Sequence, residues 1–525
     1  MKEDNWDIIV IGAGSAGAAF AVRSAEKGKR VLLIEAGRNY RSAEMHEAWR
    51  SPNPAVAIME PDAIAGMMWT DLNATRTDTQ PEAIYWRGKG VGGSSSVNGQ
   101  IAIRPPLEDF DEWSTSGCEG WSGEEVLPYF SKLENDEDFG AAEYHGDSGP
   151  TPIYRAPRNK WGAVDTALAD SALAAGHPWA ADVNAPQATG VSPYPINSHD
   201  SRRVSVNDAY LEGARELPTL TILGEATVDR VLFEDSRAVG VSLLSGQDSE
   251  TRYADTVVLS AGVIHSPTIL LRSGIGPHHQ LESLGIDVLA DLPVGQGLQD
   301  HAMASITLPL NDSSGISSPD DRHTNVCVRW SSGPEEGTEI VRYNDLMFVS
   351  MNQSVISMAT ANTGAEYGAF GVWLNQADSR GTVTLTSTDP HAQPAVAERM
   401  LSEIGDRARL RAGIRAAVKL LDQDATQAIL GGSVKDCNQE LFAVLDDDDA
   451  LDAHLLATVA DAQHGTSTCR MGRADDPTTV VDSDCRVHGT ENLYIVDASI
   501  FPSVPRANTN LASIMVGELM ADRIN

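Results

Sequence analysis

The sequence predicts an α/β protein in which a Rossmann-like dinucleotide-binding domain is interleaved with a substrate domain built on an antiparallel sheet with helices. Two observations support the first domain: a glycine-rich turn joins a buried strand to a helix near residue 12, and a second such unit begins near residue 254. Strand-like segments between residues 301 and 460 support the second domain. The chain of 525 residues is also too long for one ordinary core.

The composition excludes several classes of function. With 42% apolar and 22% charged residues, the chain has the composition of a soluble globular protein. Its formal net charge of −35 argues against a nucleic-acid partner, because a phosphate backbone needs clustered Lys and Arg. None of the five cysteines forms a CxxC pair, so we expect no metal site and a reducing, cytoplasmic location. No apolar run reaches the roughly 18 residues of a membrane span, and the oligomeric state is not indicated.

The first predicted element is a buried strand at residues 6–11 (WDIIVI), followed at once by the turn GAGSAG, a helical stretch and a second strand, VLLIE. Gly12 allows the tight turn, and Gly14 lets the backbone approach a diphosphate. Gly17 lets the helix pack on the strand, while Glu35 can accept hydrogen bonds from ribose hydroxyls. This spacing predicts a dinucleotide site, but it does not distinguish NAD from FAD.

Three later stretches extend this domain. The small residues of YWRGKGVGGSSSVNGQIAIRP (residues 85–105) would let the backbone pass close to a ligand, although a flexible surface loop has a similar composition. Residues 254–276 are expected to form a buried strand, a turn, a helix and a glycine stop. The segments LTILGEATVDRVLFE (220–234) and AVGVSLL (238–244) predict antiparallel strands appended to the parallel sheet.

Residues 301–460 differ in character from the segments before them. Strand-like runs occur at 344–351 (NDLMFVSM), 367–375 (YGAFGVWLN) and 381–387 (GTVTLTS), and a helical pattern covers 400–423. This pattern predicts a sheet with helices covering one side, which would serve as the substrate domain.

The C-terminal segment contains two candidate site residues. His464 lies in DAQHGTSTCRMG, and Asn508 precedes the predicted helix LASIMVGELMADRI, which follows the predicted strand LYIVDAS. The histidine is a candidate base, although a histidine is more often structural. The asparagine could hold the polar edge of a ring or simply cap the helix. For His145 and His301, both in loops, a structural hydrogen bond is the expected role.

Together these pieces resemble the glucose–methanol–choline (GMC) family of FAD-dependent oxidoreductases. The resemblance runs from about residue 6 to the end of the chain and rests on seven motifs in the family's order. They are GAGSAG…EAG, RGKGVGGSSSVNG, DFDEWSTSGCEGWSGEEVLPYF, SAGVIHSPTILLRSGIGP, LPVGQGLQDH, SRGTVTLTSTDP, and HGTSTCRMG with VDASIFPSVPRANTN. Within the family, the chain looks most similar to the branch that contains aryl-alcohol and hydroxymethylfurfural oxidases and choline dehydrogenases.

The resemblance implies that the dinucleotide is FAD. We expect an FAD-binding domain made of residues 1–155, 215–300 and 461–525, and a substrate domain made of residues 156–214 and 301–460. The expected cofactor contacts come from all three FAD-binding segments. They are Gly12, Gly14, Ser15, Gly17, Glu35, Ala36, Arg87, Gly88, Val91, Gly92, Gly93, Ser94, Asn98, Gly99, Val228, Ala261, Gly262, Asp497, Ala498, Asn508, Thr509 and Asn510.

The resemblance also implies the chemistry. His464 matches the family's catalytic histidine, and Asn508 matches its partner. The expected substrate is a primary alcohol, aromatic or furanic. It would lose its hydroxyl proton to His464 and a hydride to flavin N5, and so form an aldehyde. O₂ or another acceptor would reoxidise the flavin. The alternatives are a choline-like or other alcohol dehydrogenase with a non-oxygen acceptor, a flavin-bound lyase or photodecarboxylase on the same scaffold, and a non-catalytic flavoprotein.

Two positions depart from the family's pattern. Ser467 stands where the family commonly has glycine, and Val97 stands where several members carry the histidine that binds FAD covalently. Because valine has no nucleophilic atom, we expect non-covalent FAD. The candidates for the substrate pocket are Asp461, Gln463 and the residues near Met351, Trp373 and Asn375.

Overall fold

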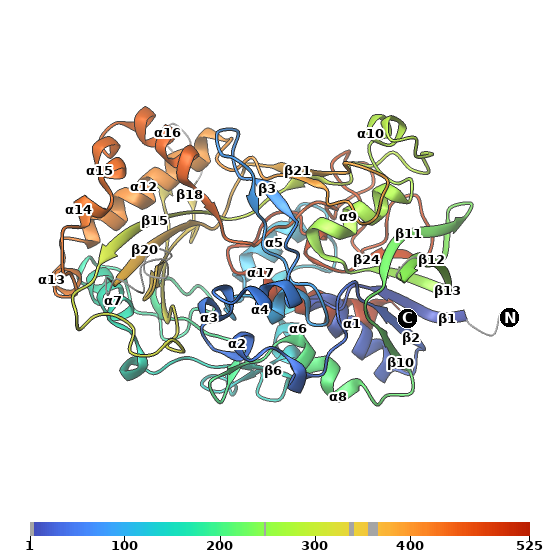
Figure 1. Cartoon of the computed structure of the whole chain (residues 1–525), viewed down its shortest axis with the longest axis horizontal. Coiled ribbons are helices and arrows are strands. Elements are labelled where there is room, and N and C mark those ends of the chain that lie inside the picture. Colours follow the sequence, from blue (N-terminus) through green and yellow to red (C-terminus); the bar gives the residue numbers. More distant parts are fainter. Residues whose placement is uncertain (1–4, 246–247, 335–340, 355–365, 525) are drawn as a thin grey trace.

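The computed structural model describes residues 5–524 except 246–247, 335–340 and 355–365. Figure 1 shows an elongated molecule with a mostly parallel sheet at one end and an antiparallel sheet with helices at the other, and both chain termini lie at the end with the parallel sheet. The mixed α/β fold class is therefore confirmed. Within the described ranges, no helix combines the length and apolar character that a membrane crossing requires.

The first sheet contains the predicted strand–turn–helix units. Its parallel strands lie in the order β10 (Leu220–Leu223), β2 (Val31–Ile34), β1 (Asn5–Ile11), β13 (Asp248–Leu259) and β24 (Leu493–Ile495). The strands β11 (Thr227–Glu234) and β12 (Arg237–Ser245) extend it antiparallel along the first half of β13, as predicted. The prediction for LTIL was wrong, since β10 runs parallel to β2. It enters the sheet after a helical crossover, α8 (Glu212–Ala214), and so from the same end as its neighbour.

The second sheet is fully antiparallel and carries the substrate-side elements. Its strands lie in the order β23 (Ala460–Asp461), β15 (Ala302–Pro309), β20 (Tyr367–Leu374), β19 (Leu346–Met351), β16 (Val326–Trp330) and β7 (Gly190–Pro193). The helices α7 (Ala163–Ala174) and α12 (Ile404–Leu420) bury their apolar residues against one face, as predicted. Side chains of alternate parity, such as Met347, Val349 and Trp373, point to the other face and pack in a separate apolar cluster that includes Ile101.

A third, five-stranded sheet lies between the other two. It has the order β14 (Gln296–Leu298), β21 (Gly381–Thr384), β22 (Ala395–Ala397), β3 (Asn73–Thr75) and β4 (Ala83–Ile84). The segment GTVTLTS therefore does not join the antiparallel substrate sheet. Short polar strands of this kind pair with whichever edge the chain path brings close, and here β21 pairs with β14 and β22. The predicted domain boundaries remain predictions.

Helices from the two ends of the chain pack together below the first sheet. The helices are α1 (Ser15–Glu26) and α17 (Thr509–Arg523), and Arg23 Nε of α1 lies 2.9 Å from the buried carboxylate of Glu518 on α17. Ser15 Oγ donates to Asn510 Oδ1 at 2.8 Å. Because α17 begins at Thr509, Thr509 and Asn510 lie in its first turn rather than before it, and Asn508 alone takes the N-cap position. Further helices include α5 (Leu107–Thr115), α6 (Gly123–Leu133), α9 (Gly262–Arg272) and α16 (Asp448–Thr458).

Candidate active site

A cavity of about 420 Å³ lies at the carboxyl ends of β1, β2 and β13, and the segment that follows β23 also lines it. Segments that are far apart in sequence form its walls. The predicted site residues among them are Gly12, Gly14, Ser15, Glu35, Ala36, Arg87, Gly88, Gly93, Ser94, Asn98, Gly99, Val228, Ala261, Gly262, His464, Asp497, Ala498, Asn508, Thr509 and Asn510.

The two glycine-rich loops are in direct contact at the floor of this cavity. Gly12 has a φ of +100°, and a Cβ there would lie 2.3 Å from the carbonyl oxygen of Ser260. A Cβ on Gly93 would lie 2.7 Å from the Cα of Gly14, whereas the nearest atom to a Cβ on Gly14 is 3.9 Å away. The backbone at Gly14 is thus open on the side where a diphosphate would approach, and any side chain there would fill that space.

Glu35 directly follows β2 at the cavity wall, and its carboxylate is hydrogen-bonded to the loops around it. Its carboxylate accepts hydrogen bonds from the backbone N–H groups of Ala13 at 3.0 Å and of Gly37 and Gly90 at 2.9 Å. Each carboxylate oxygen has more than one acceptor site, so these bonds leave capacity for a ribose hydroxyl. Glu35 therefore both holds the two glycine loops together and presents an acceptor to the cavity.

Three predicted cofactor residues do not line the cavity. Gly17 packs inside the fold, where a Cβ would meet the carbonyl oxygen of Gly12 at 2.0 Å. Gly92 donates its backbone N–H to Ala13, and Val91 is fully buried with its carbonyl accepting from Tyr40. These residues bring the helix and loops close enough to form the cavity, but other residues form its surface.

His464 and Asn508 lie together on the cavity wall. Asn508 Nδ2 is 2.9 Å from His464 Nε2. The asparagine side chain makes no capping hydrogen bond to α17 in the structure, and its buried Oδ1 has no hydrogen-bond partner among the described residues. The interpretation of Asn508 as a helix cap by its side chain is therefore not supported. Its amide is directed at the histidine instead.

A chain of hydrogen bonds determines which nitrogen of His464 carries the proton. His301 Nε2 lies 2.9 Å from the carbonyl oxygen of Pro505, which can only accept, so this nitrogen is protonated. His301 Nδ1 must then accept from His464 Nδ1, 2.9 Å away. His464 Nε2 is left without a proton, and it faces the cavity beside the amide of Asn508.

Both imidazoles are neutral at neutral pH. Burial, the neighbouring His301 and the Arg87 guanidinium hold the pKa of His464 well below its usual range. Burial likewise lowers the pKa of His301 to about 4. A neutral histidine whose Nε2 carries no proton can take one from a hydroxyl group that reaches it from the cavity, while the neighbouring amide donates to the same oxygen. The sequence predicts only a structural hydrogen bond for His301, and its position beside Asp300 in LQDH is the one local signal of this role.

Ser467, which stands where the family commonly has glycine, adopts a backbone conformation that is unfavourable for serine. Ser467 adopts a φ of +74°, in the left-handed region that favours glycine, the residue commonly found here in the family it resembles. Its hydroxyl donates to Thr466 Oγ1 at 3.0 Å, which holds the side chain inside the buried loop. The loop after His464 therefore keeps a glycine-like backbone with a serine in place.

The candidates for the substrate pocket separate into two groups. Gln463 lines the cavity. The Trp373 ring lies 5.4 Å from the His464 ring, and its Nε1 has no partner among the described residues. By contrast, Asp461 is buried against Arg76. Met351 packs at the end of β19, and Asn375 is fully buried. Among these candidates, Gln463 is the one that lines the cavity.

Comparison with known proteins now identifies the family. Models described as GMC oxidoreductase match residues 6–303 and 377–517. The chain belongs to the GMC oxidoreductase family. It is 35% identical to the 5-(hydroxymethyl)furfural oxidase of Methylovorus sp., with 100% of this chain and 99% of that protein covered. It is 33% identical to the oxygen-dependent choline dehydrogenase of Photobacterium profundum, with 99% and 93% covered.

Solved structures agree with this assignment. A crystal structure of pyridoxine 4-oxidase from Mesorbium loti superimposes with a TM-score of 0.86 at 25% identity, covering 99% of both chains. A fungal aryl-alcohol oxidase shares the fold with a TM-score of 0.83. This GMC oxidoreductase is thus an FAD-dependent enzyme that acts on the CH–OH group of alcohol-type substrates.

The residues present fit FAD. The open backbone at Gly14 suits a diphosphate, and the carboxylate of Glu35 suits a ribose. The free Oδ1 of Asn508 is an orphan acceptor at the opposite end of the cavity, beside His464. FAD bound along this path would place its diphosphate on the helix α1 and its reactive ring near the histidine.

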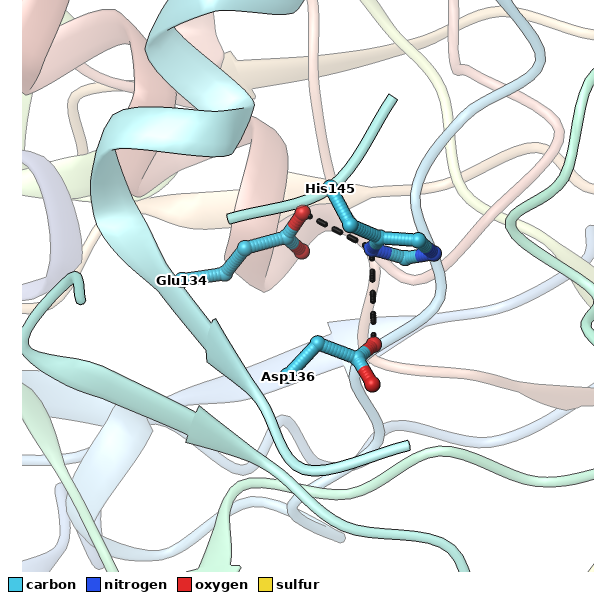
Figure 2. Close-up of side chains that lie close together, drawn as sticks. All are labelled: Glu134, Asp136 and His145. Carbon is cyan, nitrogen blue, oxygen red and sulfur yellow. Dashed lines mark hydrogen bonds and ion pairs between the residues drawn. The ribbon is translucent and has the colours of Figure 1, made fainter. Parts of the chain in front are cut away.

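A second polar cluster lies away from this cavity. Glu134, Asp136 and His145 come close enough to surround a metal ion, as Figure 2 shows. However, Arg104 lies 2.6 Å from Glu134, and Arg155 lies 2.8 Å from Asp136. A metal cation would meet both guanidinium groups, so we interpret the cluster as a charge-compensated ion network of the GMC scaffold.

His145 is protonated in this network. Its two ring nitrogens each lie 2.9 Å from a carboxylate, of Glu134 and of Asp182. Burial disfavours the charged imidazole, but these hydrogen bonds outweigh it and raise the pKa of His145. Because the folded pKa lies above the unfolded one, the stabilisation is complete below about pH 6.5 and is lost as the pH rises through the folded pKa.

Replacing His145 by alanine is expected to lower the free energy of unfolding by about 3–5 kcal/mol at pH 6, because it leaves buried carboxylates short of a partner. The difference from wild type should shrink at pH 9. Urea denaturation at both pH values measures it. The matched control is His199→Ala, whose exposed ring pairs with Glu137 at 3.3 Å and should contribute below 1 kcal/mol. A pH-independent loss would contradict a protonated His145.

Proposed function

We propose that this enzyme oxidises a primary alcohol, aromatic or furanic, to the aldehyde, with His464 as the base. The observation that carries the proposal is the unprotonated Nε2 of His464, 2.9 Å from Asn508 Nδ2 on the wall of the cavity. An alcohol oxygen that approaches this pair from the cavity, within reach of both nitrogens, would donate its proton to His464 Nε2 and accept from Asn508 Nδ2. As the proton leaves, the amide stabilises the negative charge on the oxygen.

Each residue has a separate task in this step. His301 holds the proton on His464 Nδ1 and so keeps Nε2 free. Asn508 orients the hydroxyl group, and the fully buried Pro505–Asn508 segment fixes the amide. When bound, FAD supplies the two-electron acceptor for the carbon-bound hydrogen of the alcohol, and O₂ or another acceptor restores it.

The surroundings of His464 favour a planar, uncharged substrate. The indole of Trp373 offers an aromatic face 5.4 Å from the His464 ring. The Arg87 guanidinium lines the same cavity and would repel a quaternary ammonium group such as that of choline. The names of relatives include both a furfural-alcohol oxidase and choline dehydrogenases, so the names alone do not decide between these classes.

An anaerobic panel of alcohols tests the substrate class. Benzylic and furanic primary alcohols are expected to bleach the flavin absorbance faster than choline, by about tenfold or more in kcat/KM, the scale of one unfavourable charge contact. The aldehyde is identified in the same samples. A preference for choline would refute the aromatic class. Bleaching by no alcohol would refute oxidation and favour a lyase on this scaffold.

We propose O₂ as the acceptor. The same turnover, run in air, should then yield one hydrogen peroxide for each aldehyde. Fast turnover with a quinone or dye, without peroxide, would instead make the enzyme a dehydrogenase.

We propose that FAD is bound without a covalent bond. Val97 lines the cavity and carries no nucleophilic atom, and the hydroxyl of its neighbour Ser96 is already hydrogen-bonded inside the loop. Acid denaturation followed by centrifugation should leave the yellow colour in the supernatant. A peptide heavier by one flavin in mass spectrometry would show that another residue forms the link. A cytoplasmic location also remains a prediction from the sequence.

A further inference from the structure

A group of buried charges lies directly behind His464 and has no role in the chemistry so far. It contains the carboxyl groups of Asp300, Asp461 and Glu398 and the guanidinium groups of Arg76 and Arg87. Three carboxyl groups and only two guanidinium groups therefore share this buried region. Such an imbalance is costly unless one acid keeps its proton.

Asp300 is the member that contacts the catalytic histidines. Its Oδ1 accepts the backbone N–H of His464 at 2.8 Å and that of His301 at 2.7 Å. Its Oδ2 accepts from the Tyr85 hydroxyl at 3.0 Å, and this hydroxyl in turn accepts from Arg87 at 2.5 Å. One carboxylate therefore holds the backbones of both histidines and links them to a cation on the cavity wall.

Asp461 and Glu398 complete the group. Asp461 Oδ2 lies 2.9 Å from Arg76 Nε, and its other oxygen accepts from Gln463. Glu398 is only 3% exposed, and neither of its carboxylate oxygens has a hydrogen-bond partner among the described residues. The titratable and charged groups that face Glu398 are Asp461, Asp300, Arg76, Arg87 and Tyr85.

The protonation states follow from this arrangement. Burial and the nearby charges of Asp461 and Asp300 hold the pKa of Glu398 well above its usual range, which favours its protonated form. Burial and the charge of Asp461 raise the pKa of Asp300 to about 7. Asp300 therefore gains and loses its charge near neutral pH, while the pKa of His464 lies well below that range.

The chemistry assigned to His464 needs a counter-charge. In many enzymes a carboxylate accepts from the second nitrogen of the base, but here that position is taken by neutral His301. When His464 takes a proton from an alcohol, a buried imidazolium forms with no carboxylate bonded to its ring. Asp300, bonded to its backbone, is the nearest acid that the described hydrogen bonds connect to it.

We propose that Asp300 is the positioning residue of this site: its carboxylate fixes both histidine backbones and supplies the counter-charge for the imidazolium of His464, and Asp461 and Glu398 tune that charge. This inference rests on the proposed function of His464 as the base. It predicts that activity falls below neutral pH because Asp300, rather than the catalytic histidine, gains a proton there.

The variant Asp300→Asn separates charge from structure, because asparagine keeps the Oδ1 acceptor for both N–H groups. The rate of anaerobic flavin reduction at pH 8 should fall roughly 10–30-fold, the scale of one charge pair across several ångströms in a protein. We expect the wild-type rate to decline below about pH 7, and this decline should be absent from the variant. An unchanged rate and pH profile would mean a purely structural role and would overturn the proposal.

A second variant tests the tuning. In Asp461→Asn one negative neighbour is gone, so the pKa of Asp300 falls and the acid limb of the profile should move to lower pH. The matched control is Asp406→Asn: this buried carboxylate also accepts backbone N–H groups, of Asp378 and Ser379, but lies outside the cavity. The control should leave the profile in place. If the acid side of the pH–rate profile does not move in Asp461→Asn, Asp461 does not influence the charge of Asp300.

Infrared spectroscopy gives a readout that does not depend on turnover. At pH 8 the wild-type protein should show a buried carboxylic-acid band that is missing in Glu398→Gln. Near pH 7 it should show a second carboxyl titration that is missing in Asp300→Asn. Absence of both features from wild type would overturn the assignment of protons. If His464→Ala reduces flavin normally while both features are present, the proposed function fails and the protonation of the group stands.

Discussion

Replacing His464 by alanine is expected to slow anaerobic reduction of the flavin by alcohol roughly 10²–10⁴-fold, the usual range for loss of a general base. The physical reason is that no other neutral base among the described residues presents a free nitrogen to the same point of the cavity. FAD should stay bound, since the glycine loops and Glu35 are untouched. Stopped-flow absorbance of the flavin measures the rate, and the visible spectrum measures FAD content.

The companion variant Asn508→Ala should slow reduction less than His464→Ala does, because the amide orients the hydroxyl but accepts no proton. A His464→Ala enzyme that reduces its flavin within a few-fold of wild type would rule out the base assignment. Loss of FAD from either variant would be scored as a binding defect and repeated at saturating FAD.

Replacing His301 by alanine is expected to slow flavin reduction roughly 100-fold, the upper scale seen when a residue that orients a functional histidine is lost. Without the acceptor at His301 Nδ1, the proton of His464 is no longer held on its Nδ1. A share of the molecules would then carry it on Nε2, where the alcohol must donate. The same stopped-flow assay measures the effect.

The double variant His301→Ala/His464→Ala makes this prediction specific. If His301 acts only through His464, the double variant should be no slower than His464→Ala alone. Effects that multiply would show that His301 contributes independently. The exposed His279→Ala serves as the control for a histidine deletion and should match wild type.

Much of the fold was predictable because it depends on local patterns. The β-branched strand before Gly12, the helix after it and the acid at Glu35 follow one another in a spacing that only one arrangement satisfies. The apolar periodicity of α12 and the apolar runs of β19 and β20 are likewise visible within a few residues of sequence. His464 and Asn508 came from motif position, because the resemblance covers nearly the whole chain.

Strand partners were predicted less well. The direction of β10 and the sheet that β21 joins depend on where the chain returns after long crossovers, and alternation of side chains is the same for a parallel or an antiparallel partner. The segment 381–387 looked like its neighbours in sequence, yet it pairs with strands drawn from residues 296–298 and 395–397.

The sequence by itself predicted a dinucleotide at the first glycine turn, and its resemblance to a family marked a histidine and an asparagine near the C-terminus as the candidate catalytic pair. Only the tertiary structure decided the state of that histidine. His301 and His464 are 163 residues apart, and Asp300, Asp461 and Glu398 come from three different segments. Tautomer and charge depend on distances of a few ångströms and on exclusion of water, and neither quantity is encoded in spacing along the chain.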